Sequence, residues 1–188
     1  MWVSSMEKIK LIEPTIEYEK DIWDFRQEIL DSDDKDKFAG CGTLEICSSA
    51  KEWIENCKLI SNKDTCPISK VPSNVYIAVR INDNKIVGII DLRHHIDHPI
   101  LSSWGGHIGY YVRPNERKKS YGKEMLRLNL INAQKLGIKK VLITCNQNNI
   151  ASEKTIISNG GIFETLITVG EELMKRYWIT LDLSLIHI

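Results

Sequence analysis

The stretch VRPNERKKSYGKEML, residues 112–126, joins two segments of different periodicity. The run before it, 107–112, is apolar and strand-like, and the run after it repeats apolar side chains at helical spacing. Three consecutive cations, Arg117, Lys118 and Lys119, stand at the turn between them. A helix dipole disfavours cations at its N-terminus unless an anion is present, and free backbone N–H groups there favour a phosphate. We therefore interpret the turn as a local phosphate site, the alternative being a solvated cationic helix face.

The charge of the whole chain is balanced, although this stretch is basic. Lys plus Arg and Asp plus Glu each number 25. A chain of zero net charge is not a general polyanion binder, so any basic function must be local. The basic run also lacks the interleaved aromatics of a nucleic-acid binder, and we expect no nucleic-acid partner.

Length and composition indicate one domain, 1–188, with a core at about 8–183 and a tail at 184–188 that we expect to fray. No apolar run approaches the roughly 20 residues of a membrane span, so no membrane partner is expected. The first ten residues lack the apolar segment of a signal peptide. Five cysteines, an odd number without a CxxC pair, favour a reduced, cytoplasmic protein.

Periodicity predicts a mixture of strands and helices. Strands are expected at 8–13, 75–81, 85–94, 107–112, 139–146, 162–169 and 174–183, and helices at about 15–30, 50–60, 121–136 and 151–159. This order is that of an α/β or α+β domain with a mixed sheet. The strand–helix–strand crossover in the middle implies two parallel strands.

The basic turn is neither a Walker A loop nor a dinucleotide fingerprint, because GxxxxGK[ST] and GxGxxG are both absent. It resembles the acetyl-CoA pyrophosphate loop of the GNAT N-acetyltransferases, V-x-P-x-x-R-x-x-G-x-G/A. The matching residues are Val112, Pro114, Arg117, Ser120 and Gly122. Ser120 departs from the usual glycine, and serine resists a positive φ.

A second signature of the same family follows after the next strand. The pattern N-x-x-[AS]…G-[FG] is met by Asn149, Ser152 and Gly160. The run from RHHIDHP to GGHIGYYVRP also resembles a bacterial GNAT subfamily of predicted acetyltransferases. The order of elements agrees with the family over about residues 8–183.

The resemblance implies a single-domain GNAT fold in which strands four and five of a mixed central sheet splay apart. The cofactor is then acetyl-CoA, with CoA as product, and its pantetheine arm lies in the splay. Backbone N–H groups of strand four would hold the thioester carbonyl and stabilise the oxyanion. The residues expected to bind the cofactor are Tyr110, Tyr111, Val112, Arg117, Lys118, Lys119, Ser120, Tyr121, Gly122, Lys123, Asn149 and Ser152.

The family's usual acid and base positions are not filled here. Its frequent tyrosine, seven residues after the motif asparagine, is Ile156, and the strand-four glutamate is also missing. Histidine has a pKa of about 6.5 that suits proton transfer, so His94, His95 and His107 are the expected catalytic candidates. The alternatives are histidines that merely bond loop backbone, or a zinc site. We expect no metal, because adjacent histidines on a strand point opposite ways.

Further candidates are less specific. Trp104 could line the acceptor pocket or pack plainly. Asp33, Asp34 and Asp36 could attract a cationic substrate or simply be solvated. Cys145 is interpreted as a buried small hydrophobe.

The sequence is thus interpreted as an N-acetyltransferase acting on a small-molecule or peptide amine of unknown identity. The vacant tyrosine position keeps open a second hypothesis, a CoA-binding sensor or interaction module without turnover. A homodimer formed through the closing strands is a further expectation from the resemblance.

Overall fold

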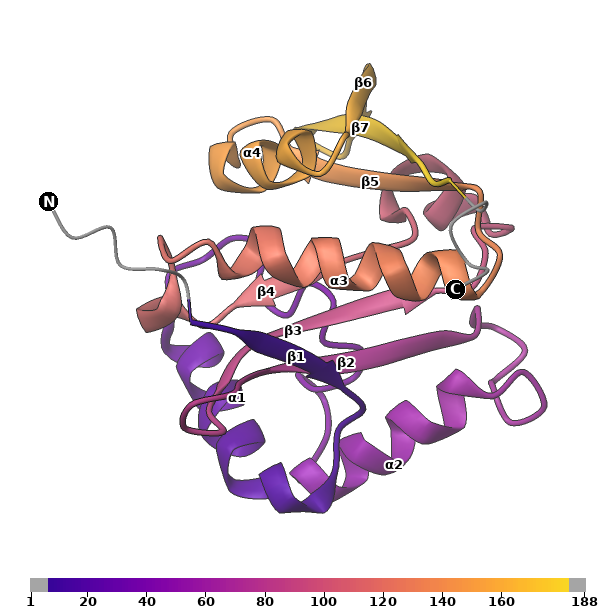
Figure 1. The fold of residues 1–188 in the computed structure, drawn as a ribbon. Helices are drawn as coiled ribbons and strands as arrows, with labels where there is room; N and C mark the ends of the chain where they lie inside the picture. The colour runs from indigo at the N-terminus through magenta and orange to yellow at the C-terminus, as the bar shows by residue number, and fades with distance from the viewer. Residues whose placement is uncertain (1–6, 183–188) are drawn as a thin grey trace, which may run out of the picture.

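The computed structural model describes residues 7–182, so the expected frayed tail, 184–188, lies outside the described residues. Its strands form two separate antiparallel sheets (Figure 1). The first has the order β1 (Ile9–Ile12), β2 (Ser73–Arg80), β3 (Ile86–Arg93) and β4 (Tyr110–Val112). The second has the order β5 (Lys140–Asn146), β7 (Glu172–Thr180) and β6 (Ile162–Val169).

Four α-helices accompany these strands: α1 (Glu19–Asp31), α2 (Ala50–Ser61), α3 (Tyr121–Lys135) and α4 (Ile150–Ser158). The short turns are η1 (Ile16–Tyr18), η2 (Leu101–Gly105) and η3 (Pro114–Glu116). The predicted order of elements and the fold class are confirmed. Helix 15–30 begins with the 3-10 turn η1, and the side chain of Thr15 makes no capping bond.

The first sheet separates two apolar layers, because neighbouring residues of a strand face opposite sides. Ile77 and Ile89 pack in the cluster that includes the apolar faces of α1 and α2. Ala78 and Ile90 pack in the other cluster, with α3 and the second sheet. Figure 1 shows α1 and α2 below the first sheet, and α3 above it, beneath β5. Helix α3 therefore fills the space between the two sheets.

The two strands that flank α3 do not form the expected parallel ladder. The segment just before β4 meets β5 where the N–H of His107 donates to the carbonyl of Leu142 at 2.8 Å. Gly106 permits this contact, since a Cβ there would lie 2.6 Å from the Leu142 oxygen. Beyond this joint each strand pairs within its own sheet, which leaves the space between β4 and β5 open.

Strand β4 is shorter than predicted because a side chain interrupts its ladder. The buried carboxylate of Asp91 accepts the N–H of Gly109 at 2.6 Å, in place of a β3 carbonyl. The carbonyl of Asp91 instead accepts from the side chain of Asn129 on α3 at 2.8 Å. This exchange ties the helix to the start of β4 and fixes the strand that borders the opening.

Candidate functional site

A cavity of about 990 Å³ lies between β4 and β5 and extends to the N-termini of α3 and α4. Every residue expected to bind the cofactor lines it except Lys119. The Nζ atom of Lys119 is instead 2.8 Å from the carboxylate of Glu116. The strand-five motif and the basic turn therefore face the same space, although they are far apart in sequence.

The turn before α3 has the backbone shape of an anion site. Ser120 has φ +65 and ψ 10, the left-handed conformation expected of a glycine, and Lys118 has φ +62. No side chain caps α3. In the described part of the chain, the N–H groups of residues 121–123 have no acceptor. Free donors and the positive end of the helix dipole therefore point out of this turn.

Arg117 is already paired across the cavity wall. Its guanidinium donates to both carboxylate oxygens of Asp34, at 3.0 and 2.6 Å, and lies 5.1 Å from the ring centre of Tyr111. The hydroxyl of Tyr111 also donates to Asp34. The Arg117 hydrogen bond is the largest cause that lowers the pKa of Asp34 to about 2. Asp34 thus stays ionised and holds Arg117 at the mouth of the site.

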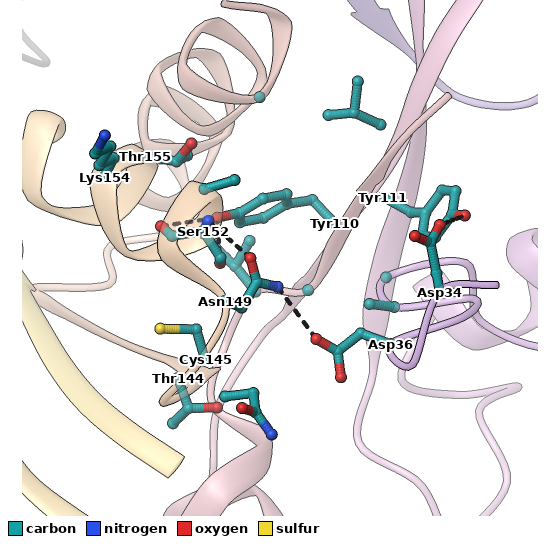
Figure 2. Close-up of a pocket in the computed structure, with 18 of the residues that line it drawn as sticks. Asp34, Asp36, Tyr110, Tyr111, Thr144, Cys145, Asn149, Ser152, Lys154 and Thr155 are labelled. Atoms are coloured by element: carbon teal, nitrogen blue, oxygen red, sulfur yellow. Dashed lines mark hydrogen bonds between the residues drawn. The ribbon is translucent and has the colours of Figure 1, made fainter. Parts of the chain in front are cut away.

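The cationic stretch divides between the cavity and the protein interior. Arg113, 2% exposed, donates to the carboxylates of Glu28 and Asp21 on α1, and so supports the fold. Lys118 and Lys123 line the cavity. Lys154 of α4 lines it as well (Figure 2), a cation that sequence reasoning missed.

Strand β4 presents free backbone donors to the opening. The carbonyl of Gly109 accepts from Asp91 at 3.0 Å, and the N–H of Arg113 donates to Val87 at 2.9 Å. Successive N–H groups of a strand point to opposite edges, so those of Tyr110 and Val112 point away from β3. They can donate to a carbonyl oxygen bound between the strands.

The opposite wall is built at the start of α4. Asn149 caps the helix, since its Oδ1 accepts the N–H of Ser152 at 3.0 Å, and its Nδ2 donates to Asp36 at 3.1 Å. The hydroxyls of Tyr110 and Ser152 are 2.7 Å apart, so the tyrosine reaches from β4 to α4 (Figure 2). Burial raises the pKa of Tyr110 to about 12.

The histidine expectation is not met by the geometry, because none of the three lines the cavity. His94 contacts Asn74 at 2.7 Å, and His95 is exposed. His107 is buried at the joint between the sheets, and its Nδ1 accepts the N–H of Leu142 at 2.9 Å. His107 precedes β4 and is directed to β5 by this hydrogen bond, and it is not among the residues that line the cavity.

Within residues 7–182, no three His, Cys, Asp or Glu side chains lie together in a group that could hold a metal ion. No helix in the same range is long and apolar enough to cross a membrane.

The acidic loop, defined here as residues 32–40, forms part of the cavity wall. Four of its charged residues line the cavity, namely Asp34, Lys35, Asp36 and Lys37, and Asp33 does not. Composition marked the loop as charged, but nothing local indicated what it would cover. Trp104 of η2 also lines the cavity, as one of its two interpretations proposed. Cys145 is buried beside the opening, and burial raises its pKa to about 11.

The whole fold is similar to that of several solved acetyltransferases. RimL, a ribosomal L7/L12 alpha-N-protein acetyltransferase solved with coenzyme A, aligns with a TM-score of 0.66 at 14% identity, over 96% of this chain and 98% of its own. The microcin C7 self-immunity acetyltransferase MccE, solved with acetyl-CoA and AMP, aligns at 0.65 and 15% identity over 93% of each chain. A GNAT-family acetyltransferase from Bacillus anthracis aligns at 0.59 and 16%, over 93% of this chain and 96% of its own.

At these identities the structural likeness establishes the fold alone, and among curated proteins none matches the sequence. The model of the acetyltransferase (GNAT) domain matches residues 16–162, which is most of the chain. The protein therefore belongs to the GNAT acetyltransferase family, whose domain uses acetyl-CoA as its co-substrate.

Proposed function

We propose that the protein is an acetyl-CoA-dependent N-acetyltransferase that moves the acetyl group directly to a primary amine. The observation that carries this proposal is that one cavity contains two kinds of donor. The free N–H groups of Tyr110 and Val112 lie along one part of it, and the uncapped N-terminus of α3 lies along another. A thioester and a pyrophosphate at the two ends of one ligand need these two kinds of donor.

The cavity residues fit the cofactor by their chemistry. The left-handed Ser120 and the N–H groups after it form a concave donor set for the pyrophosphate. Lys118, Lys123 and Lys154 add positive charge around it. Asn149 can offer its Nδ2 to an amide of the pantetheine arm, since its Oδ1 is committed to the helix cap.

The chemistry required of the protein is electrostatic. As the amine nitrogen forms its bond to the acetyl carbon, negative charge develops on the carbonyl oxygen, and the N–H groups of Tyr110 and Val112 stabilise it. The nitrogen then gives its extra proton to solvent, the carbon–sulfur bond breaks, and CoA leaves as a thiolate that solvent protonates. No covalent acyl-enzyme is needed.

The test is calorimetric titration with acetyl-CoA, followed by thiol release across an amine panel. We expect saturable binding that the paired change Lys118→Ala and Lys123→Ala weakens by about 10-fold or more. Arg127→Ala is the matched control, because Arg127 pairs with Glu124 at 2.7 Å and does not line the cavity. Absence of acetyl-CoA binding in the parent protein would overturn the proposal.

A second candidate is a CoA-binding module without turnover. Ile156 fills the position of the family tyrosine and is completely buried, so it offers no acid to the leaving thiolate. Thiol release above background with any amine would exclude a pure binding module.

The same proposal includes the domain, the location and the oligomeric state of the protein. One domain of about residues 8–183 carries the activity in the cytoplasm, on a small-molecule or peptide amine. Pairing of the closing strands β6 and β7 between two copies would give a homodimer, which sedimentation at several concentrations would test.

A further inference from the structure

We propose that Asp36 is the residue that recognises the acceptor, by pairing its carboxylate with the ammonium group of a cationic primary amine. This inference rests on the proposed N-acetyltransferase function and adds the charge class of the acceptor. The ammonium must lose a proton to solvent before its nitrogen attacks, so Asp36 determines which amines enter rather than the bond-forming step.

The first argument compares the carboxylates that line the cavity within residues 7–182, namely Asp34, Asp36 and Glu116. Asp34 is neutralised by the two hydrogen bonds from Arg117. Glu116, 7% exposed, accepts from Arg80 and Lys119, each at 2.8 Å. Both carboxylates already have cationic partners, so neither has charge left for a substrate.

Asp36 differs because its partner is neutral. Its carboxylate accepts from the amide of Asn149 at 3.1 Å and pairs with no cation of the described chain. The residue is exposed and lines the cavity (Figure 2). An ammonium that reaches this oxygen makes a charge-assisted hydrogen bond without displacing an internal ion pair.

The second argument is the position of Asp36 relative to the β4 donors. The acidic loop is pressed onto the start of β4 at Gly40, where a Cβ would lie 2.1 Å from the Gly109 oxygen and 2.7 Å from the Tyr110 nitrogen. Asp36 precedes this contact by one short turn of chain and reaches across to Asn149 at the start of α4. Its carboxylate therefore stands between the two walls that would hold the acetyl group and the cofactor arm.

The bond between Asp36 and Asn149 also links the two ligands. The Nδ2 atom that Asp36 holds is the donor available to the pantetheine arm. The amide nitrogen carries two hydrogens, so it can donate to the arm while it keeps its hydrogen bond to Asp36. The same amide therefore holds the Asp36 carboxylate next to the cofactor arm, where the acceptor cation would bind.

The experiment compares Asp36→Asn with Asp33→Asn, a matched change at an exposed residue of the same loop that does not line the cavity. Thiol release is measured with pairs of similar acceptors, a protonated alkylamine and a neutral hydrazide. We expect Asp36→Asn to lower kcat/KM for the cationic acceptor by about 10-fold or more through KM. The neutral acceptor and the acetyl-CoA Kd should change by less than about 2-fold, and Asp36→Glu should restore part of the preference.

A parallel titration of alkylammonium ions into the CoA-saturated protein needs no turnover. Binding that Asp36→Asn weakens about 10-fold supports the Asp36 site even if no amine is acetylated, in which case the proposed function alone fails. Conversely, if the parent protein acetylates amines and Asp36→Asn treats cationic and neutral acceptors as the parent does, Asp36 is not the recognition residue while the function stands.

Discussion

The Nδ1 atom of His107 accepts the N–H of Leu142 at 2.9 Å, while the N–H of His107 donates to the carbonyl of the same leucine at 2.8 Å. Only a neutral imidazole has a nitrogen that can accept, so this joint between the sheets needs an unprotonated His107. Burial is the largest cause that lowers the pKa of His107 to about 4, from an ordinary value of 6.5.

A pH dependence of stability follows from this joint. Since the pKa of His107 is lower in the folded than in the unfolded chain, protonation favours unfolding. The stabilisation is complete above about pH 6.5 and is lost toward pH 4, by at most about 3 kcal/mol. We expect the free energy of unfolding in urea to fall over this window. His107→Gln keeps a neutral acceptor and should flatten the fall; the same slope in both proteins would contradict the assignment.

Gly40 should be among the least replaceable residues of the acidic loop. Its φ is +71, and a Cβ would meet the Gly109 oxygen at 2.1 Å. Gly137 is the control, because its φ is +76 but nothing lies within 4 Å of a Cβ. Left-handed strain costs about 1 kcal/mol in both, and overpacking adds about 1–3 kcal/mol at Gly40 alone. In urea unfolding, Gly40→Ala should therefore have a much lower free energy of unfolding than Gly137→Ala. Equal losses of stability in the two variants would show that the loop can move to accommodate the Cβ.

Ser120→Gly should stabilise the protein without weakening acetyl-CoA binding. The serine holds φ +65, which glycine adopts freely, so the change relieves about 0.5–1 kcal/mol of strain. Thermal unfolding and calorimetric titration measure the two effects. Ser120→Val is the opposite test, since a β-branched residue resists this conformation and should reduce both stability and affinity. A destabilised glycine variant would mean that the serine hydroxyl has an unrecognised role.

Removing the charge of Asp34 should tighten acetyl-CoA binding. The carboxylate now competes with a phosphate for Arg117, whose guanidinium it holds at 2.6 Å. We expect Asp34→Asn to lower the Kd by about 3-fold or more and to reduce stability by only about 0.5–1 kcal/mol, because the pair is partly exposed to solvent. Asp33→Asn provides the control. Weaker binding in Asp34→Asn would instead mean that Asp34 positions Arg117 for the phosphate.

Local patterns predicted the elements and the two motif regions well. The alternation of β2 and β3 and the helical spacing of α3 are properties of short windows of sequence. The start of α2 is equally local, since Ser49 caps it by accepting the N–H of Glu52 at 3.1 Å. The two motifs also predicted that Asn149 and the basic turn would lie near the same ligand, because the family fold fixes the positions of the elements that carry them.

Contacts between distant segments could not be predicted in this way. Arg113 lies in the same basic stretch of sequence, but it pairs in the interior with Glu28, which is far away in sequence. The hydrogen bonds of Asp34 with Arg117 and of Asp36 with Asn149 likewise join segments that are far apart in sequence. His107 is held by Leu142 of β5, a contact between distant segments that strand periodicity does not encode.

The left-handed backbone at Lys118 and Ser120 has a consequence for the kinetics of association. The turn that carries the N–H donors already has its anion-binding conformation in the free protein. Folding has therefore already removed the conformational entropy that a flexible loop would lose on binding. Capture of the pyrophosphate should then be governed by diffusion and charge steering, and should slow as ionic strength rises. In stopped-flow mixing, this predicts a single phase whose rate climbs linearly with ligand concentration, without a slow isomerisation of the turn afterwards.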